Sequence, residues 1–125
     1  MNTPPRFAQQ VALITGGTSG IGLAVARRLS AEGATLVLLD FNEAAFAGLA
    51  KEFAPPHVFL KVDVTQEAAV SAAVNTTLAQ LGRIDILVNC AGITGKTNLK
   101  SHEVALSDFD QVLKTNLYGT FLTSK

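Results

Sequence analysis

The sequence predicts an α/β fold around a parallel sheet, because four apolar runs suited to strands alternate with stretches suited to helices. Each run is apolar almost throughout, as expected for strands that helices cover on both faces. The runs also recur at nearly even spacing, which is typical of successive βαβ units. The expected strands are residues 11–15, 35–40, 58–62 and 84–89.

Helices are expected between these strands, over residues 21–32, 43–53 and 66–81. Thr65 is the expected N-cap of the third helix, since a Thr hydroxyl can accept a bond from a free N–H of the first turn. Apolar residues recur at helical spacing along that helix and predict one buried face. These residues are Val70, Val74, Leu78 and Leu81.

A last helical region is expected to begin near Ser107, after a loop from about residue 90 to 100. Ser107 to Asp110 resembles a capping box in which Asp replaces Glu. The helical pattern still runs at Lys125 and shows no stop signal. The expected buried stripe is Phe109, Val112, Leu113, Leu117 and Phe121.

Composition favours a folded protein that acts on small molecules. Apolar residues make up 48% of the chain, enough for a buried core. Lys plus Arg and Asp plus Glu number 10 each, so no basic surface for nucleic acid is indicated. The single Cys90 excludes an internal disulfide and a cysteine-built metal site, and is expected to be a small buried hydrophobe. Without a signal peptide or a membrane span, we expect a soluble cytoplasmic protein.

A glycine-rich turn separates the first strand from the first helix, in Gly16-Gly-Thr-Ser-Gly-Ile-Gly22. Without Cβ atoms the backbone can approach a diphosphate closely, and the helix N-terminus supplies free N–H groups with partial positive charge. The spacing differs from Gly-x-Gly-x-x-Gly, and no Gly-Lys-Ser/Thr follows, which excludes a nucleotide-triphosphate loop. The turn therefore predicts a nucleotide of another class.

Polar residues stand at the carboxyl ends of the four expected strands: Thr15, Asp40, Asp63 and Asn89. Ligands of open parallel sheets bind outside this edge, so these residues are expected to line one crevice. Asp63 could equally be a turn or capping residue, and Asn89 could belong to an ordinary strand-to-loop turn.

Asp40 lies where an acidic residue binds the adenosine ribose hydroxyls, about 20 residues beyond the glycine turn. Its carboxylate would repel a 2′-phosphate. Phe41 and Asn42 follow it and the glycine turn carries Thr18 and Ser19, so no cation adjoins it in sequence. These features favour NAD over NADP. The alternative is a solvated carboxylate that caps the next helix.

Several motifs that occur together and in order resemble the short-chain dehydrogenase/reductase family: Thr15-Gly-Gly-Thr-Ser-Gly-Ile-Gly22, Asp40, Asp63-Val64, Asn89-Cys-Ala-Gly92 and Asn116. The resemblance spans essentially the whole chain. It implies that residues 1–125 are the N-terminal part of a single NAD(P)-binding domain, a doubly wound sheet with strand order 3-2-1-4 that is truncated after its fourth strand and the following helix. It implies a Rossmann fold with the diphosphate at the glycines, the adenosine ribose at Asp40, the adenine at Asp63-Val64 and the nicotinamide-side ribose near Ala91 and Gly92. The expected cofactor-binding set is Gly16, Thr18, Ser19, Gly20, Ile21, Gly22, Asp40, Phe41, Asp63, Val64, Asn89, Ala91 and Gly92.

The resemblance also implies hydride transfer between a nicotinamide cofactor and an alcohol or carbonyl substrate, commonly in a homotetramer. Of the family's catalytic Asn, Ser, Tyr and Lys, the Asn alone has a match, Asn116, which supports a helix irregularity and a proton-relay water in the family. Tyr118 has Leu122 four residues beyond it instead of Lys, so it lacks the cation that a tyrosine acid needs. The chain also carries Cys90 where the family usually has a second Asn.

Two functions of different classes stay open. In the first, the chain is the cofactor-binding half of an NAD-dependent oxidoreductase whose Ser and Tyr-x-x-x-Lys lie elsewhere, and it is inactive alone. In the second, it is a non-catalytic nucleotide-binding or dimerising fragment. A nucleotide-sugar epimerase predicts a different glycine spacing. An open fourth strand and a thinly covered last helix further predict that the isolated chain is marginally stable, prone to self-association by aggregation, or dependent on oligomerisation.

Overall fold

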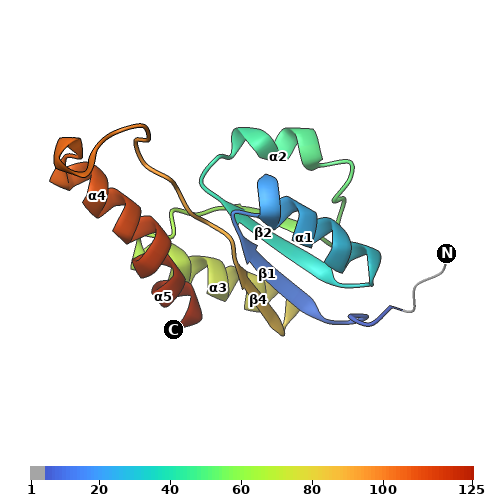
Figure 1. The fold of residues 1–125 in the computed structure, drawn as a ribbon. Coiled ribbons are helices and arrows are strands. Elements are labelled where there is room, and N and C mark those ends of the chain that lie inside the picture. The colour runs from blue at the N-terminus through green and yellow to red at the C-terminus, as the bar shows by residue number, and fades with distance from the viewer. Residues whose placement is uncertain (1–4) are drawn as a thin grey trace.

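The computed structural model describes residues 5–125 and confirms the α/β fold with one parallel sheet (Figure 1). The strand order is β3-β2-β1-β4. β1 (Val11–Thr15) and β2 (Thr35–Asp40) have the expected bounds. β3 (Val58–Lys61) ends one residue early and β4 (Ile86–Asn89) begins two residues late. Asp85 explains the late start, because its N–H donates to the Val11 carbonyl and its carboxylate accepts from the Val11 N–H at 2.8 Å.

The parallel register brings the carboxyl ends of the strands to one edge. Thr15 pairs with Leu39 on one side and with Asn89 on the other. Asp40 pairs with Lys61 at the end of β3. The loops that leave these strands therefore gather at the same edge.

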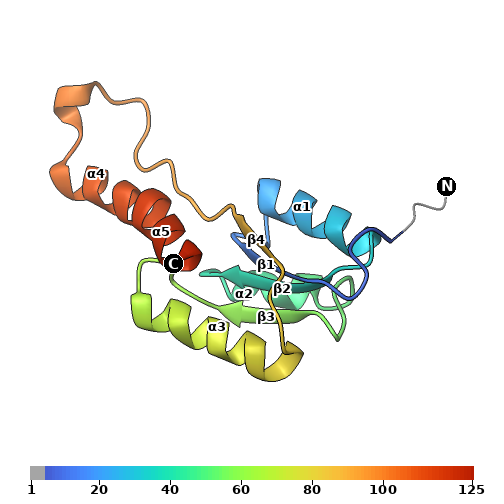
Figure 2. The same cartoon turned by 90° about the horizontal axis from the view of Figure 1, so that it is seen from below.

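Helices cover both faces of this sheet (Figure 2). α1 (Gly20–Ala31) and α2 (Ala44–Leu49) pack on one face, against Ala12, Ile14, Leu36 and Leu38. α3 (Glu67–Leu81) and α5 (Gly119–Ser124) pack on the other face, against Val11, Leu13, Val37 and Leu39. Because β1 and β2 bury side chains on both faces, each large apolar residue there contributes roughly 1.5–3 kcal/mol.

The buried face of α3 differs from the expected one. Val70, Ala73 and Thr77 are buried, whereas Leu78 is 44% exposed. Thr77 can be buried because its hydroxyl donates to the Ala73 carbonyl at 2.8 Å. The expected N-cap is also wrong: Gln66 occupies that position, because the Asp63 carboxylate accepts from the N–H and hydroxyl of Thr65 and holds it in the preceding turn.

The last helical region also turns a different face inward. It comprises α4 (Leu106–Leu113), a π-helical turn (Lys114–Tyr118) and α5. α4 begins after Ala105, so Ser107 lies inside its first turn and no capping box forms there. Gly119 packs so closely on Val64 that a Cβ on it would lie 2.6 Å from Val64 Cγ2. The inner face of the region consists of this glycine and the partly buried Val112 and Leu122.

The expected stripe is therefore exposed apart from Val112. Phe109, Leu117 and Phe121 are 54%, 58% and 62% exposed, and Leu113 is also exposed. We name the exposed residues Phe109, Leu113, Leu117 and Phe121 the outer stripe. Contiguous apolar surface of this kind marks interaction sites, so the expected self-association stays a prediction.

A buried carboxylate fixes the segment before β1. The Glu32 side chain, 2% exposed at the end of α1, accepts bonds at 2.8 Å from Arg6 Nη2 and from Arg28 Nε. The Phe7 N–H also donates to the Glu32 carbonyl. The hydrogen bonds from Arg6 and then Arg28 lower the pKa of Glu32 to about 2.

We predict that Glu32 makes folding acid-sensitive. Its pKa lies at about 2 in the folded chain against an ordinary 4.5, so its contribution is complete above pH 4.5 and is lost as the pH falls through 2. Urea unfolding of wild type and Glu32→Gln between about pH 2 and 6 measures this. The difference in free energy of unfolding should be largest near pH 6 and shrink toward pH 2. A difference that stays constant with pH would contradict the assignment.

Candidate functional site

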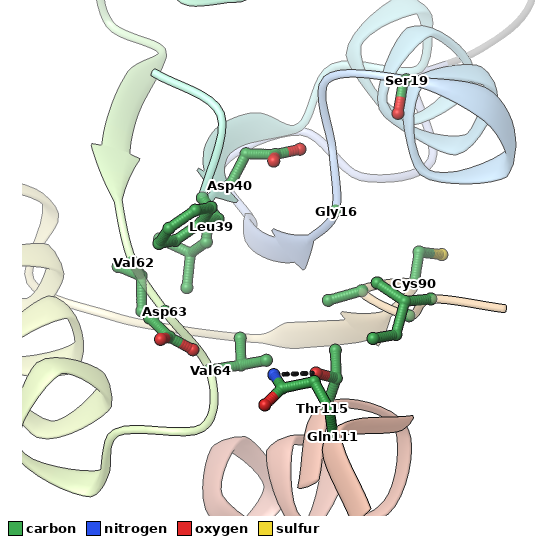
Figure 3. Close-up of a pocket in the computed structure, with 14 residues that line it drawn as sticks. Gly16, Ser19, Leu39, Asp40, Val62, Asp63, Val64, Cys90, Gln111 and Thr115 are labelled. Carbon is green, nitrogen blue, oxygen red and sulfur yellow. Dashed lines mark hydrogen bonds between the residues drawn. The ribbon is translucent and has the colours of Figure 1, made fainter. Parts of the chain in front are cut away.

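A cavity of about 300 Å³ opens at the carboxyl edge of the sheet. This volume is at the lower end of the range for small-molecule sites. Figure 3 shows that loops after all four strands and the α4 region contribute to it. Its lining residues are Gly16, Ser19, Leu39, Asp40, Phe41, Val62, Asp63, Val64, Cys90, Ala91, Gly92, Ile93, Gln111 and Thr115.

The loop between β1 and α1 passes where no side chain fits. Gly16 has a φ of +63°, and a Cβ there would lie 2.8 Å from the Ala91 nitrogen. A Cβ on Gly22 would lie 2.1 Å from the Gly16 carbonyl oxygen. The first N–H groups of α1, which follow Ser19, have no partner within their own helix. Gly16 and Ser19 line the cavity, which therefore borders a helix N-terminus with free N–H groups, a setting that suits an anion.

Asp40 ends β2 beside this loop. Its Oδ2 accepts from the Thr18 hydroxyl at 2.6 Å, and its Oδ1 accepts from the Asn42 N–H at 3.1 Å. The alternative that it caps the next helix does not match the structure, because Glu43 is the N-cap residue of α2.

Lys61 is the cation near Asp40 that sequence adjacency misses, because it lies across the sheet register. Its Nζ lies 3.8 Å from Glu43 Oε2 and 5.8 Å from the centroid of the Phe41 ring. Within residues 5–125, the ion pair of Lys61 is with Glu43, and Asp40 has none. The carboxylate of Asp40 thus meets neutral donors.

Asp63 combines two of the expected roles. Its Oδ1 accepts from the N–H and hydroxyl of Thr65 at 2.9 and 2.7 Å, which makes it a turn residue. It also lines the cavity together with the buried Val64.

The segment after β4 is held by Thr15. The Thr15 hydroxyl oxygen accepts from the N–H groups of Cys90 and Ala91, both at 3.1 Å. Cys90 is partly buried and lines the cavity, so it is not the fully buried hydrophobe expected from the sequence. The Asn89 side chain instead bonds to α5, where its oxygen accepts from the Thr123 hydroxyl at 2.5 Å and its amide donates to Ser124 Oγ at 3.2 Å.

Asn116 lies in the π-helical turn, so the helix irregularity expected there is present. Its side-chain oxygen accepts from the Ile93 N–H and its amide donates to the Ile93 carbonyl, both at 2.9 Å. This reciprocal pair needs a donor and an acceptor on one short side chain, which Asn provides. Asn116 thereby ties the helix to the loop that follows Gly92.

Most of the expected residues gather at the cavity, and others support it from outside. Those that line it are Gly16, Ser19, Asp40, Phe41, Asp63, Val64, Ala91 and Gly92. Those outside its lining are Thr18, Gly20, Ile21, Gly22, Asn89 and Asn116. Sequence reasoning missed Leu39, Val62, Cys90, Ile93, Gln111 and Thr115 as lining residues. The i, i+4 spacing of Gln111 and Thr115, one residue before Asn116, is the signal that could have found the last two.

Across residues 5–125, no three His, Cys, Asp or Glu side chains gather in a way that could hold a metal ion. No helix in the same range is long and apolar enough to cross a membrane.

We predict that Gly22→Ala destabilises the fold, because its Cβ would overlap the Gly16 carbonyl oxygen. Overpacking of this kind typically costs about 1–3 kcal/mol. Gly48→Ala is the matched control, since a Cβ there meets open space on α2 and Ala raises helix propensity by up to about 1 kcal/mol. Urea unfolding should show opposite signs for the two variants. Equal effects would refute the steric argument.

Comparisons with known proteins agree with this geometry. Residues 10–125 match the family model described as short chain dehydrogenase. The chain is 48% identical over 115 residues to 3-hydroxyacyl-CoA dehydrogenase type-2 of Bos taurus, covering 89% of this chain and 44% of that protein. It is 41% identical over 120 residues to 2-dehydro-3-deoxy-L-rhamnonate dehydrogenase (NAD(+)) of a Sphingomonas species, covering 96% of this chain and 47% of the relative.

A solved structure of 3-ketoacyl-(acyl-carrier-protein) reductase from Brucella melitensis, complexed with NADH, superposes with a TM-score of 0.89 at 36% identity. The match covers 94% of this chain and 48% of the reductase. The chain thus spans just under half the length of these relatives. With the family model matched over residues 10–125, the chain belongs to the short-chain dehydrogenase family.

Proposed function

We propose that this chain is the cofactor-binding half of an oxidoreductase that transfers hydride between a nicotinamide dinucleotide and an alcohol or carbonyl substrate. The observation that carries the proposal is the cavity itself, with a glycine loop on one side and the Asp40 carboxylate on the other. The names of the relatives, two dehydrogenases and a reductase solved with NADH, support the same chemistry.

The diphosphate fits the glycine loop. Gly16 and Ser19 line the cavity, and the close packing of Gly16 on Ala91 and of Gly22 on the Gly16 carbonyl fixes the course of the loop there. The free N–H groups at the start of α1 would donate to the diphosphate oxygens, and the helix dipole favours their negative charge. Ser19, Gly20 and Ile21 supply the first turn of that helix.

We propose that NAD is preferred over NADP because Asp40 stays an uncompensated anion. A carboxylate accepts bonds from ribose hydroxyls and repels a 2′-phosphate. Lys61 is the nearby cation that could reverse this preference, but its ammonium group lies 3.8 Å from Glu43 Oε2 and 5.8 Å from the centroid of the Phe41 ring, and it forms no ion pair with Asp40. The printed names of the Sphingomonas relative and the Brucella structure, NAD(+) and NADH, are consistent with this preference.

The remaining groups would position the rest of the dinucleotide. Asp63 and Val64 would flank the adenine, and Ala91 and Gly92 the nicotinamide-side ribose. Asn116 would support this placement, since its two hydrogen bonds with the Ile93 backbone fix the loop at that end of the cavity. A bound nicotinamide ring would supply the hydride donor or acceptor. A homo-oligomer is supported by the exposed outer stripe, and a cytoplasmic location stays a prediction.

Calorimetric titration with NAD and NADP tests the ribose assignment. We expect wild type to bind NAD more tightly, and Asp40→Ala to lose about tenfold in NAD affinity, because charged hydrogen bonds contribute about 1.5–3 kcal/mol. NADP affinity should not fall, since the repulsion is removed. Asp110→Ala, which removes a carboxylate paired with Lys114 outside the cavity, is the control. Equal wild-type affinity for the two cofactors would overturn the assignment.

A second test separates the enzyme from a non-catalytic binding module. We propose that the serine and the Tyr-x-x-x-Lys pair lie beyond residue 125 in the protein that carries this chain. That protein should reduce NAD with a secondary alcohol, followed by absorbance of the reduced nicotinamide. Residues 1–125 alone should bind NAD without turnover. Cofactor binding with no turnover in either sample would favour the non-catalytic module instead.

A further inference from the structure

We propose that Thr18 is a positioning residue that sets cofactor discrimination by fixing the Asp40 carboxylate. The proposal rests on the proposed function and adds a residue that acts through Asp40 and not on the cofactor. Thr18 is outside the cavity lining and only 8% exposed, so its part in the site needs an explanation other than direct contact.

The contact is short and lies between two separate parts of the site. Thr18 belongs to the glycine loop, and its hydroxyl donates to Asp40 Oδ2 at 2.6 Å across 22 residues of sequence. The Thr18 N–H lies 3.4 Å from the same oxygen, a longer and weaker contact. On the other side, the Asn42 N–H donates to Oδ1 at 3.1 Å. The carboxylate is thus held at both oxygens.

This arrangement leaves acceptor capacity for a vicinal diol. A carboxylate offers about four acceptor positions, two on each oxygen. The two short protein bonds use one position on each oxygen, and the second position on Oδ2 faces only the long contact from the Thr18 N–H at 3.4 Å. Oδ1 therefore keeps one free position, and a ribose hydroxyl could replace the long contact at Oδ2. Without the Thr18 hydroxyl the carboxylate could turn about its terminal torsion, whose energy profile is broad for Asp. These two positions would then no longer be fixed toward the ribose.

The chemical type of the donor also matters for discrimination. A hydroxyl stabilises the anion without compensating its charge, whereas a lysine or arginine would form an ion pair with it. Within residues 5–125 no lysine or arginine forms an ion pair with Asp40, and the ammonium group of Lys61 lies beside Glu43 instead, so the negative charge of Asp40 stays available to repel a 2′-phosphate. Thr18 therefore fixes the orientation of the Asp40 carboxylate and leaves its negative charge uncompensated.

Calorimetric titration of the protein that carries this chain, with NAD and with NADP, tests the proposal. Thr18→Val removes the hydroxyl and keeps the branched shape. We expect it to weaken NAD binding about fivefold, the loss typical of one hydrogen bond, with a smaller change for NADP. Thr18→Ser keeps the hydroxyl and should stay within about twofold of wild type for NAD. Thr18→Ala removes the same group with less volume and serves if the Val variant does not fold.

A double-mutant cycle with Asp40→Ala then identifies the path of the effect. If Thr18 acts through Asp40, Thr18→Val should change NAD affinity little once Asp40 is absent. Additive losses, or equal losses for NAD and NADP, would overturn the proposal, because Thr18 would then act on the loop alone. If the wild type binds neither nucleotide, the proposed function itself is refuted. If the wild type binds NAD but the losses of the two variants are additive, only the role of Thr18 is refuted.

Discussion

The close contact between the glycine loop and the segment after β4 is the constraint on which the site depends. Gly16 meets the Ala91 backbone and Gly22 meets the Gly16 carbonyl, both at distances that exclude a Cβ. Thr15 completes the junction by accepting bonds from the N–H groups of Cys90 and Ala91. Because backbone packs on backbone here, the N-terminus of α1 is brought beside the β4 loop, and the cavity forms between them.

The electrostatic character of the site follows from the parallel register. Alignment of β2 and β3 puts a carboxylate and a lysine at paired positions, Asp40 and Lys61. The two do not form an ion pair, because Glu43 and Phe41 engage the lysine while Thr18 and Asn42 engage the carboxylate. Each charge thus has its own partners, so the Asp40 carboxylate stays free of an ion pair and is available to bind ribose hydroxyls.

Local patterns predict the sheet and most of its edge, but the orientation of a helix depends on tertiary contacts. The parallel strands and the lining positions of Asp40 and Asp63 follow from apolar runs that end in polar residues, whereas the strand order follows from the family resemblance. Lys61 was missed because its proximity to Asp40 arises from register and not from sequence. The outer stripe is exposed and not buried as expected, because periodicity shows that a helix has an apolar face, but small residues such as Gly119 determine which face packs closely.

The last helical region can serve two surfaces because a π-helical turn interrupts it. One inserted residue rotates the following side chains by about 100° relative to a continuous α-helix. Gln111 and Thr115 line the cavity and Asn116 holds Ile93, while Gly119 still packs on Val64 one turn later. Leu113 and Leu117 of the outer stripe are outside the cavity lining. A partner that covered the outer stripe would therefore leave the lining residues of this helix in contact with the cavity.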